Sequence, residues 1–468
     1  MITLKQIYTL LFLLGLFFIP FNEFDGLPFL GEYKDEAASY FFLLGFGVVC
    51  IESILAKKIC FPYKNPLIIV ITLFIIWSCV VTVINYDTVL NNFYKQTSGI
   101  GRYIRQTISL LISAGCFTFL FWNVIKNTGL SKSIKQIRKV LLYSFVFVAI
   151  YGFFEIAIVY LGMGVLKPIW NLFEFFPFVN NSLHNGGRVG ISSVTWEIPA
   201  LGNYLIFVTP WMLSYIFTEK KLIKFIPSLV VVILMLFSNA RAAFVVIGLQ
   251  IICFILILLH DQQYRKITVL GLKTIGVVIF MLFILKSETI YRTVNEKTDQ
   301  LNFSKNLTQS ISNKSRFGMQ YAALQVFKEN PITGVGFGQG TYHMVPYYPY
   351  WSTANNWEFK YLYKDQQNKS FPPQYNIYTR LLAETGLVGT LLFLTLIISC
   401  IFLALNYWQK VGVHDRYIAV VVLLSFIGFS VNWLQVDFFK QYGFWLNLVL
   451  LIKGMDELSK KKENIIIS

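Results

Sequence analysis

Charged side chains are scarce in this sequence. They make up 14% of its 468 residues, whereas a soluble domain usually carries about 25%. Cysteine is scarce as well: there are six, none in a C-x-x-C pair, which gives no support for a disulfide framework or a zinc site. No D-x-D motif occurs, so a metal-held nucleotide sugar has little support. These absences exclude a soluble enzyme, a disordered tail protein and a secreted disulfide scaffold.

Long apolar runs are what the sequence does have. Hydrophobic residues make up 56% of it, in repeated runs of about 20 residues, which is the length that spans a bilayer core. The pattern predicts an all-α polytopic membrane protein with about twelve transmembrane helices. The expected spans cover residues 6–21, 37–56, 66–84, 106–125, 140–161, 198–217, 222–237, 242–260, 267–286, 384–406, 417–437 and 442–453.

Lysine and arginine indicate the orientation of these spans, because cytoplasmic loops carry an excess of both. With the N-terminus inside, twenty of them fall in the inner loops and tail, and eight fall in the short outer segments. This bias predicts two cytoplasmic termini, which requires an even number of spans. The net charge of +16 is then expected at inner loops and anionic lipids, so it does not indicate a nucleic-acid partner.

One long segment interrupts this pattern of short loops. Residues 287–377 lie between the ninth and tenth expected spans and are too rich in tyrosine and tryptophan for a disordered loop. The chain therefore divides into spans one to nine over residues 1–286, a large outer loop over 287–377, and spans ten to twelve with a cytoplasmic tail over 378–468. Within the loop, residues 315–330 have the apolar spacing of an amphipathic helix on the outer membrane surface.

Two arginines are candidates for binding an anion. Arg316 lies in the first turn of the expected amphipathic helix, where it opposes the helix dipole unless an anion lies nearby, and Gln320 shares its face one turn later. Arg241 lies between two apolar runs, at or just below the outer surface, where an ionisable group is a functional candidate. The structural alternatives are an arginine that snorkels to the surface and simple anchoring at the interface.

Glu197 stands at the outer mouth of the sixth span, just before Pro199 at an expected helix start. In one interpretation, its carboxylate does no more than complement the helix dipole. Alternatively, it is a carboxylate at a partly dry membrane edge, with a pKa suited to proton abstraction. Arg188 precedes it, and His343 is an outer-loop histidine that could reach the same site. Glu155, inside the fifth span, could bond within the bundle or mark the proton path of a transporter.

The glycine-rich segment from Gly334 to Gly340 is not a dinucleotide fingerprint, because no expected strand precedes it. It could be a flexible turn after a helix that stops at Pro331. Alternatively, it allows the backbone to approach a phosphate or a sugar closely.

Four motifs in order over residues 188–390 resemble the O-antigen ligase/polymerase superfamily of bacterial membrane glycosyltransferases, which includes the Wzy-type polymerases. The resemblance implies a glycosyltransferase fold of the C type and an active site at the periplasmic or extracellular face of the bacterial inner membrane. The motifs are Trp196-Glu197-Ile198-Pro199 with Asn203-Tyr204-Leu205, then Ser238-Asn239-Ala240-Arg241-Ala242, then Arg316 with Tyr321-Ala322-Ala323 and residues 330–338, and finally Tyr375-Asn376 through Gly389.

The chemistry that the resemblance implies is transfer of a glycan from undecaprenyl pyrophosphate, which is a good leaving group and needs no metal, nucleotide or other cofactor. Arg241 and Arg316 are the expected catalytic arginines, because preorganised guanidinium groups stabilise developing phosphate charge. Glu197 is the expected base. The expected substrate-binding residues are Arg188, Gln320, His343, Tyr375 and Asn376.

Ligase-like members of the superfamily commonly have histidine before the asparagine of the last motif, where this chain has Tyr375. That departure favours an oligosaccharide repeat-unit polymerase that makes O-antigen, capsule or exopolysaccharide. Its expected partners are the lipid-linked glycan donor and acceptor, a chain-length regulator, a flippase and membrane lipids. The alternatives are a ligase of the same superfamily and a twelve-span transporter or flippase.

Overall fold

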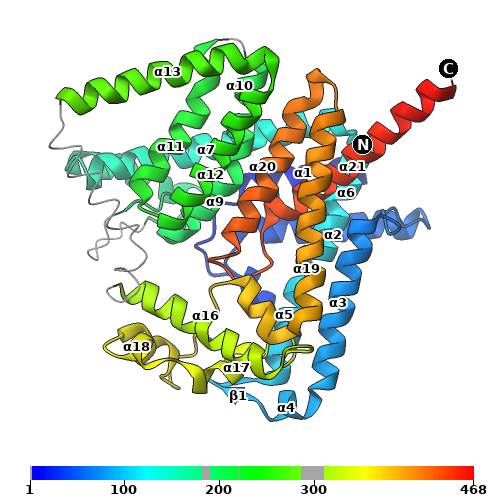
Figure 1. Cartoon of the computed structure of the whole chain (residues 1–468), viewed down its shortest axis with the longest axis vertical. Helices are drawn as coiled ribbons and strands as arrows, with labels where there is room; N and C mark the ends of the chain where they lie inside the picture. Colours follow the sequence, from blue (N-terminus) through cyan, green and yellow to red (C-terminus); the bar gives the residue numbers. More distant parts are fainter. Residues whose placement is uncertain (1–2, 182–189, 220, 286–309, 468) are drawn as a thin grey trace.

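The chain folds into a bundle of long helices (Figure 1). This computed structural model describes residues 3–181, 190–219, 221–285 and 310–467. Helices suit the long apolar runs, because a membrane-spanning segment must satisfy its backbone N–H and C=O groups internally. Over the described residues, strand is limited to one hairpin of β1 (Phe93–Tyr94) and β2 (Thr97–Ser98). The prediction of an all-α polytopic chain is confirmed.

The helices before residue 220 alternate between long spans and short connecting turns. They are α1 (Leu4–Phe17), η1 (Pro28–Tyr33), α2 (Ala37–Leu55), α3 (Pro66–Ile84), α4 (Tyr86–Asn91), α5 (Gly99–Leu111), η2 (Ile112–Phe117), α6 (Thr118–Thr128), α7 (Leu130–Val159), η3 (Gly164–Leu166), α8 (Lys167–Asn171), η4 (Leu172–Phe175), α9 (Ile198–Leu213) and α10 (Tyr215–Thr218).

The second half of the chain contains the longest helix and the described part of the large loop. Its helices are η5 (Leu222–Phe225), α11 (Ile226–Ser238), α12 (Arg241–His260), α13 (Gln262–Leu285), α16 (Ile311–Glu329), α17 (Gly340–Met344), η6 (Val345–Tyr347), α18 (Tyr350–Thr353), η7 (Glu358–Tyr363), α19 (Ile377–Lys410), η8 (Val413–Asp415), α20 (Arg416–Asn432) and α21 (Tyr442–Ile467).

Within the described residues, seven helices are long and apolar enough to cross a membrane, and three shorter apolar helices accompany them. The chain is therefore a multi-pass membrane protein. The seven are Ala37–Leu55, Pro66–Ile84, Gly99–Thr128, Leu130–Val159, Ile198–Thr218, Arg241–His260 and Ile377–Lys410, and the shorter ones are Leu4–Phe17, Leu222–Ser238 and Arg416–Asn432. The total of twelve spans and the cytoplasmic termini stay predictions, and the side chains of α13 beyond Lys273 lie outside the described residues.

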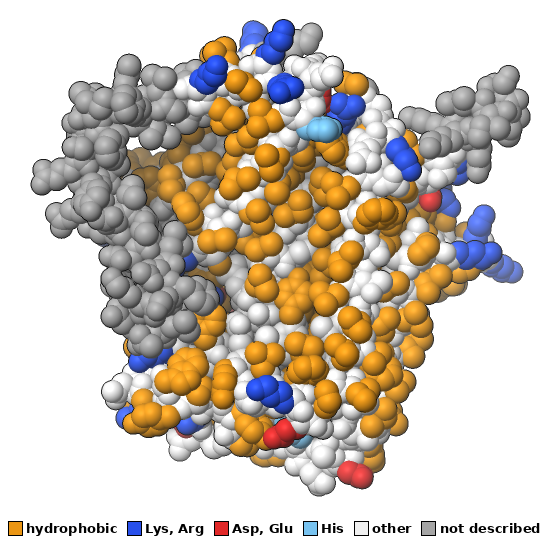
Figure 2. Space-filling model, viewed as in Figure 1, with side chains coloured by type: hydrophobic (Ala, Val, Ile, Leu, Met, Phe, Trp, Pro, Cys, Tyr) orange, Lys and Arg blue, Asp and Glu red, His pale blue; other side chains and the backbone are white. Residues whose placement is uncertain are grey.

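The flank of the bundle is apolar. Figure 2 shows hydrophobic side chains spread over the middle of this face, with lysine and arginine gathered toward its ends. On α19, Ile398 and Phe402 have 63% and 67% of their surface exposed, and on α3 Ile76 has 53% exposed. Isolated apolar residues are normal on soluble proteins, but a continuous apolar flank suits hydrocarbon.

The described part of the large loop packs on one end of the bundle. Figure 1 shows α16, α17 and α18 at the same end as α4 and the β1–β2 hairpin. Helix α16 contacts α19, and α19 in turn packs against α3 and α20. The charge bias of the sequence predicts that this end is the outer one.

Helix α16 confirms the helix that the sequence predicts. Tyr321 and Leu324, which belong to the apolar face expected to lie on the membrane surface, are 46% and 37% exposed. A second face packs against the protein and is made of small and slender residues: Gly318, Met319, Ala322, Ala323 and Val326. Small residues allow α16 to approach α18 and α19 closely, and Gly318 lies directly against Ser352. The larger apolar side chains of α16 lie on its exposed face.

Candidate active site

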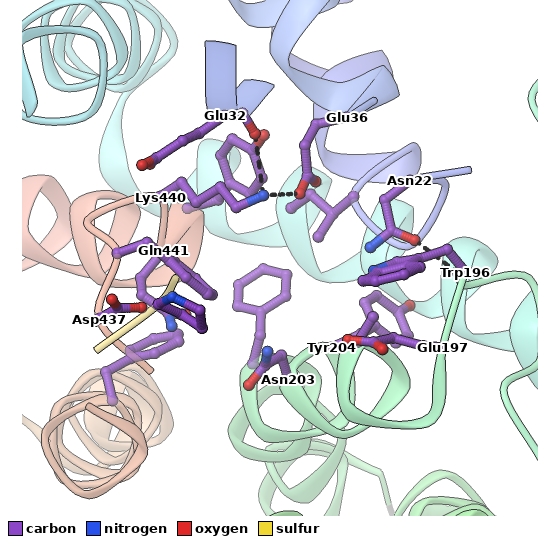
Figure 3. Close-up of a pocket in the computed structure, with 18 of the residues that line it drawn as sticks. Asn22, Glu32, Glu36, Trp196, Glu197, Asn203, Tyr204, Asp437, Lys440 and Gln441 are labelled. Carbon is purple, nitrogen blue, oxygen red and sulfur yellow. Dashed lines mark hydrogen bonds and ion pairs between the residues drawn. The ribbon is translucent and has the colours of Figure 1, made fainter. Parts of the chain in front are cut away.

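A cavity of about 380 Å³ lies where the ends of several helices meet, on the side of the bundle that carries the large loop (Figure 3). Its volume falls within the range of about 300–1,000 Å³ that is typical of small-molecule sites. Its walls come from the segment after α1, from η1 and the first turns of α5, α9 and α19, from residues 371–373, and from the connection between α20 and α21. The polar and aromatic lining residues are Asn22, Glu32, Glu36, Arg102, Trp196, Glu197, Asn203, Tyr204, Phe371, Arg380, Asp437, Phe438, Lys440, Gln441 and Tyr442.

Glu32 is an ionised carboxylate in the wall of this cavity. It accepts hydrogen bonds from Gln106 Nε2 at 2.5 Å and from Ser109 Oγ at 2.9 Å. Burial opposes its ionisation, but the nearby guanidinium groups of Arg102 and Arg380 outweigh that effect and lower the pKa of Glu32 below its ordinary value.

Lys440 joins the segment after α1 to the connection between α20 and α21. Its Nζ atom lies 2.6 Å from Glu36 Oε1 and donates a second bond of 3.1 Å to the backbone carbonyl of Glu32. Burial opposes the charge on Lys440, but Glu36 outweighs it and the pKa of Lys440 is raised. Figure 3 shows this group opposite Glu197 and Asn203 across the cavity.

Each of the three guanidinium nitrogens of Arg380 donates a hydrogen bond. Its Nε atom donates to Glu384 Oε2 at 3.1 Å, its Nη2 atom to Gln106 Oε1 at 2.6 Å, and its Nη1 atom to the backbone carbonyl of Asp437 at 2.5 Å. Only 3% of this side chain is exposed. Because all three nitrogens have partners, Arg380 fixes the geometry of the wall and lends it positive charge.

The glycine-rich segment has a structural explanation in this network. Helix α19 is broken at Gly386, which has a φ of +63°. The break frees the carbonyls of residues 383 and 384, and they accept hydrogen bonds of 3.0 Å from Val335 and Gly336. Gly338 N–H donates to the Glu384 carboxylate at 2.9 Å. The segment therefore docks into the interrupted helix and is not a free turn, whereas its approach to a phosphate or a sugar stays a prediction.

Glycine is required at this junction. A Cβ atom at Gly386 would lie 2.1 Å from the carbonyl oxygen of Ile332, and one at Gly334 would lie 2.5 Å from the backbone of Glu384. Both residues also have a positive φ, which favours glycine. The close approach of these two backbones fixes Glu384, and through it Arg380, relative to the large loop.

Glu197 occupies the N-cap position of α9, with an extended backbone. Its side chain makes no capping hydrogen bond with the helix, although Ser, Thr, Asp and Asn at this position usually do. Instead Glu197 lines the cavity. The preceding Trp196 N–H donates to Asn22 Oδ1 at 3.1 Å, and Thr195 Oγ1 donates to the Glu197 carbonyl at 3.0 Å. These bonds fix the backbone that presents the carboxylate.

Helix α9 separates the cavity from the start of α12. Its Asn203 and Tyr204 line the cavity, whereas Gly202 packs against Ala240 and Ala243 of the neighbouring helix. Arg241, the first residue of α12, is exposed and does not line the cavity. Arg188, the other arginine expected near Glu197, lies outside the described residues, as does His184.

Four predicted substrate-binding or catalytic residues gather at the start of α19. The guanidinium carbon of Arg316 lies 5.0 Å from the centre of the Tyr375 ring, and the Arg316 Nε atom is buried without a hydrogen-bond partner. Asn376 caps α19 by accepting bonds from Tyr378 and Thr379 N–H, and its Nδ2 atom donates to Gln320 Oε1 at 3.4 Å. This group does not line the cavity, but it adjoins it.

The backbone of residues 374–377 connects this group to the cavity. Gln374 N–H donates to Asp437 Oδ2 at 2.6 Å, and Ile377 N–H donates to the Trp433 carbonyl. Tyr375, between them, has a φ of +58°, and its hydroxyl bonds with that of Tyr363 at 2.5 Å. Burial raises the pKa of the Tyr375 phenol, so this hydroxyl stays protonated.

His343 lies apart from both groups, on α17. Its Nε2 atom is buried without a hydrogen-bond partner, and burial lowers its pKa although Glu329 acts in the opposite direction. Among the aromatic residues of the large loop, Tyr348, Phe359 and Tyr363 are buried, whereas Tyr350, Trp351, Trp357 and Tyr361 are at least 40% exposed. The exposed set is available for contact with a ligand.

Sequence reasoning missed most of the charged residues of the cavity. Arg102 was counted only as a charge of an outer segment, and Lys440 likewise. Arg380 and Glu384 stood inside a quoted motif without a role. Their spacing of four residues within an apolar run was the available signal, because ionisable residues inside a span are functional candidates. Asp437, the last residue of the expected span 417–437, carried the same signal, whereas Glu32 carried none.

Metal ligation finds no support in the described part of the chain, where no three histidine, cysteine, aspartate or glutamate side chains gather. No curated protein sequence matches the chain. The family model described as O-antigen ligase matches residues 226–394, a stretch that includes Arg241, Arg316, the glycine-rich segment and the start of α19. Over these residues the chain is similar to the O-antigen ligase family, and this match places it with the O-antigen ligase/polymerase superfamily of membrane proteins.

Proposed function

We propose that this protein is a glycosyltransferase that polymerises oligosaccharide repeat units carried on a polyprenyl pyrophosphate, at the outer face of the membrane. Its superfamily contains membrane glycosyltransferase-like ligases and polymerases. The observation that carries the proposal is the position of Glu197, which lines a polar cavity at the helix ends without capping its own helix.

The acceptor sugar occupies the cavity. Carboxylates and amides bind sugar hydroxyl groups, and the cavity offers Glu32, Asn203 and Gln441 among others. The faces of Trp196 and Phe371 are available for stacking. Arg102 completes this wall, with its guanidinium carbon 4.4 Å from the centre of the Phe371 ring.

The donor reaches the site from the bilayer, so its pyrophosphate meets residues at the outer membrane edge. Arg241 is exposed at the start of α12, and the Arg316 Nε atom has no partner. Both guanidinium groups can form bidentate, charge-assisted bonds to phosphate oxygens. Glu197, at the head of α9, stands where the acceptor and donor sides meet.

The reaction is a single displacement at the anomeric carbon of the donor glycan. The acceptor hydroxyl oxygen forms the new glycosidic bond while the bond from the anomeric carbon to the phosphate oxygen breaks. Glu197 accepts the hydroxyl proton. The polyprenyl pyrophosphate leaves with the electron pair, and the two arginines stabilise its charge.

The state of Tyr375 favours a polymerase over a ligase. Ligase-like relatives have histidine at this position, which can accept a proton near neutral pH. The Tyr375 hydroxyl is bonded to Tyr363, and its pKa is raised, so it is a poor base. The proton acceptor must then come from elsewhere, and Glu197 is the carboxylate at the mouth of the span.

A reaction of purified protein with lipid-linked repeat units tests this function. The units are extracted from a host strain in which the coding region is deleted. A ladder of products with increasing repeat number supports polymerisation. Transfer of one unit to an added lipid acceptor, without a ladder from repeat units alone, would instead identify a ligase. Arg241→Ala and Arg316→Ala proteins should each form less than a tenth of the product in this reaction, and full activity of both would remove the arginines from the donor site.

A further inference from the structure

Glu155 of α7 holds the segment that leads into α9. It is 2% exposed, and both oxygens of its carboxylate accept hydrogen bonds from backbone N–H groups. Ser192 N–H lies 3.2 Å from Oε1, and Ser193 N–H lies 2.7 Å from Oε2. This buried acid therefore bonds the chain only four residues before Glu197.

The segment that Glu155 holds has a strained conformation. Ser193 has a φ of +53°, a region that residues other than glycine rarely adopt. Its hydroxyl donates to the carbonyl of Val148 at 2.7 Å, which ties the same residue to α7 a second time. Strain of this kind persists only where surrounding contacts hold it.

The hydrogen bonds continue from Ser193 to Glu197. Thr195 Oγ1 donates to the Ser192 carbonyl at 2.7 Å and to the Glu197 carbonyl at 3.0 Å. A displacement of Ser192 and Ser193 therefore moves the backbone of Glu197.

We propose that Glu155 is a positioning residue for Glu197. It fixes the left-handed turn at Ser193 and thereby places the Glu197 carboxylate at the wall of the cavity. This inference rests on the proposed function, because it assigns Glu155 a role only through the base. The bonds from Ser192 and Ser193 confirm the expectation that Glu155 bonds within the bundle, and the proposal assigns those bonds a role in the site.

The Glu155→Gln variant tests the role, because a carboxamide keeps the size of the side chain but has one acceptor oxygen instead of two. Its NH₂ group then faces a backbone donor. A misplacement of about 1 Å in an active site can cost about 10²-fold in rate. We expect kcat to fall about 10–100-fold with lipid-linked repeat units as substrate, and KM to stay within about threefold.

Rescue separates positioning from simple destabilisation. Glycine adopts a positive φ without strain, so the Glu155→Gln/Ser193→Gly double variant should recover at least about threefold in kcat over Glu155→Gln. The matched control is Gln250→Leu, which removes an equally buried polar group of α12 that bonds Ile206 and Leu424 carbonyls. It should lower protein abundance without lowering the kcat of the purified protein. An equal loss of kcat in Gln250→Leu, or no rescue in the double variant, overturns the positioning role.

Comparison with Glu197→Gln distinguishes this inference from the proposed function. An inactive Glu197→Gln beside a Glu155→Gln protein with wild-type kcat would overturn the positioning role alone. A fully active Glu197→Gln would remove the base assignment, and the role of Glu155 with it.

Discussion

Arg380 and Glu384 form an ion pair of 3.1 Å one turn apart in α19, with 3% and 1% of their side chains exposed. Glu384 also accepts bonds from Gly338 N–H and from Gln374 Nε2. The pair thus joins the broken helix to the large outer loop. Taking one partner from a buried pair leaves an uncompensated charge, which is the costly change.

Arg380→Ala should therefore destabilise the protein by about 3–5 kcal/mol, measured by unfolding of the purified protein in detergent micelles. Lys453→Ala is the matched control, since Lys453 and Glu457 have the same spacing at 3.6 Å but are 17% and 39% exposed. It should cost less than about 1 kcal/mol. Equal losses in the two variants would mean that the Arg380 pair does not support the site.

Glu32 should make stability depend on pH in the acid range. Because its folded-state pKa lies below the ordinary value of 4.5, its contribution is fully present above that value and is lost as the pH falls through the lowered pKa. Glu32→Gln should lower the melting temperature at neutral pH, and the difference from wild type should shrink below pH 4.5. A difference that stays constant from neutral pH to pH 3 would contradict the ionised state of Glu32.

Tyr375→Phe should keep most of the activity. The hydroxyl that it removes is bonded to Tyr363 and has a raised pKa, while the ring that Arg316 contacts remains. Because one neutral hydrogen bond contributes only about 0.5–1.5 kcal/mol, the initial rate should fall less than about tenfold. An inactive Tyr375→Phe protein at normal abundance would give residue 375 the proton-transfer role.

Cysteine labelling should place the large loop outside. Tyr350 is 85% exposed, so a membrane-impermeant maleimide should label Tyr350→Cys in intact cells or spheroplasts. Ser352 is buried two residues later, so Ser352→Cys should react only after denaturation and serves as the matched control. Wild type reports the background from the six native cysteines. Labelling of Tyr350→Cys only after membrane disruption would reverse the predicted topology.

The sequence was sufficient to predict the structural features that depend on a local pattern of residues. Apolar runs of span length predicted the helices, because each satisfies its own backbone bonds. The spacing of α16 predicted a helix with an apolar outer face that includes Tyr321, but it did not predict the second face, where Ala322 and Ala323 are buried. That face depends on packing between distant segments, which hydrophobic spacing alone does not reveal.

The cavity depended on contacts between distant parts of the chain. Gln106 and Arg380 are 274 residues apart and share a hydrogen bond, and Lys440 bonds Glu36 across 404 residues. Neither pair has a signature in a single sequence. The break in α19 at Gly386 could not be predicted from the sequence either, because it depends on the docking of the distant segment that contains Gly334. Glu197 was accessible from sequence because Pro199 and the apolar run marked its position at a helix start.

Initial rates of purified Glu197→Gln protein with lipid-linked repeat units test the central claim most directly. Glutamine keeps the size of the side chain and most hydrogen bonding but cannot accept the proton. We predict that the rate falls about 10²–10⁴-fold, that single lipid-linked repeats accumulate, and that a filter-binding assay shows unchanged donor binding. His343→Ala, measured alongside, should remain active. A Glu197→Gln protein that makes polymer at the wild-type rate, beside an inactive His343→Ala, would contradict the account and move the base to the outer loop.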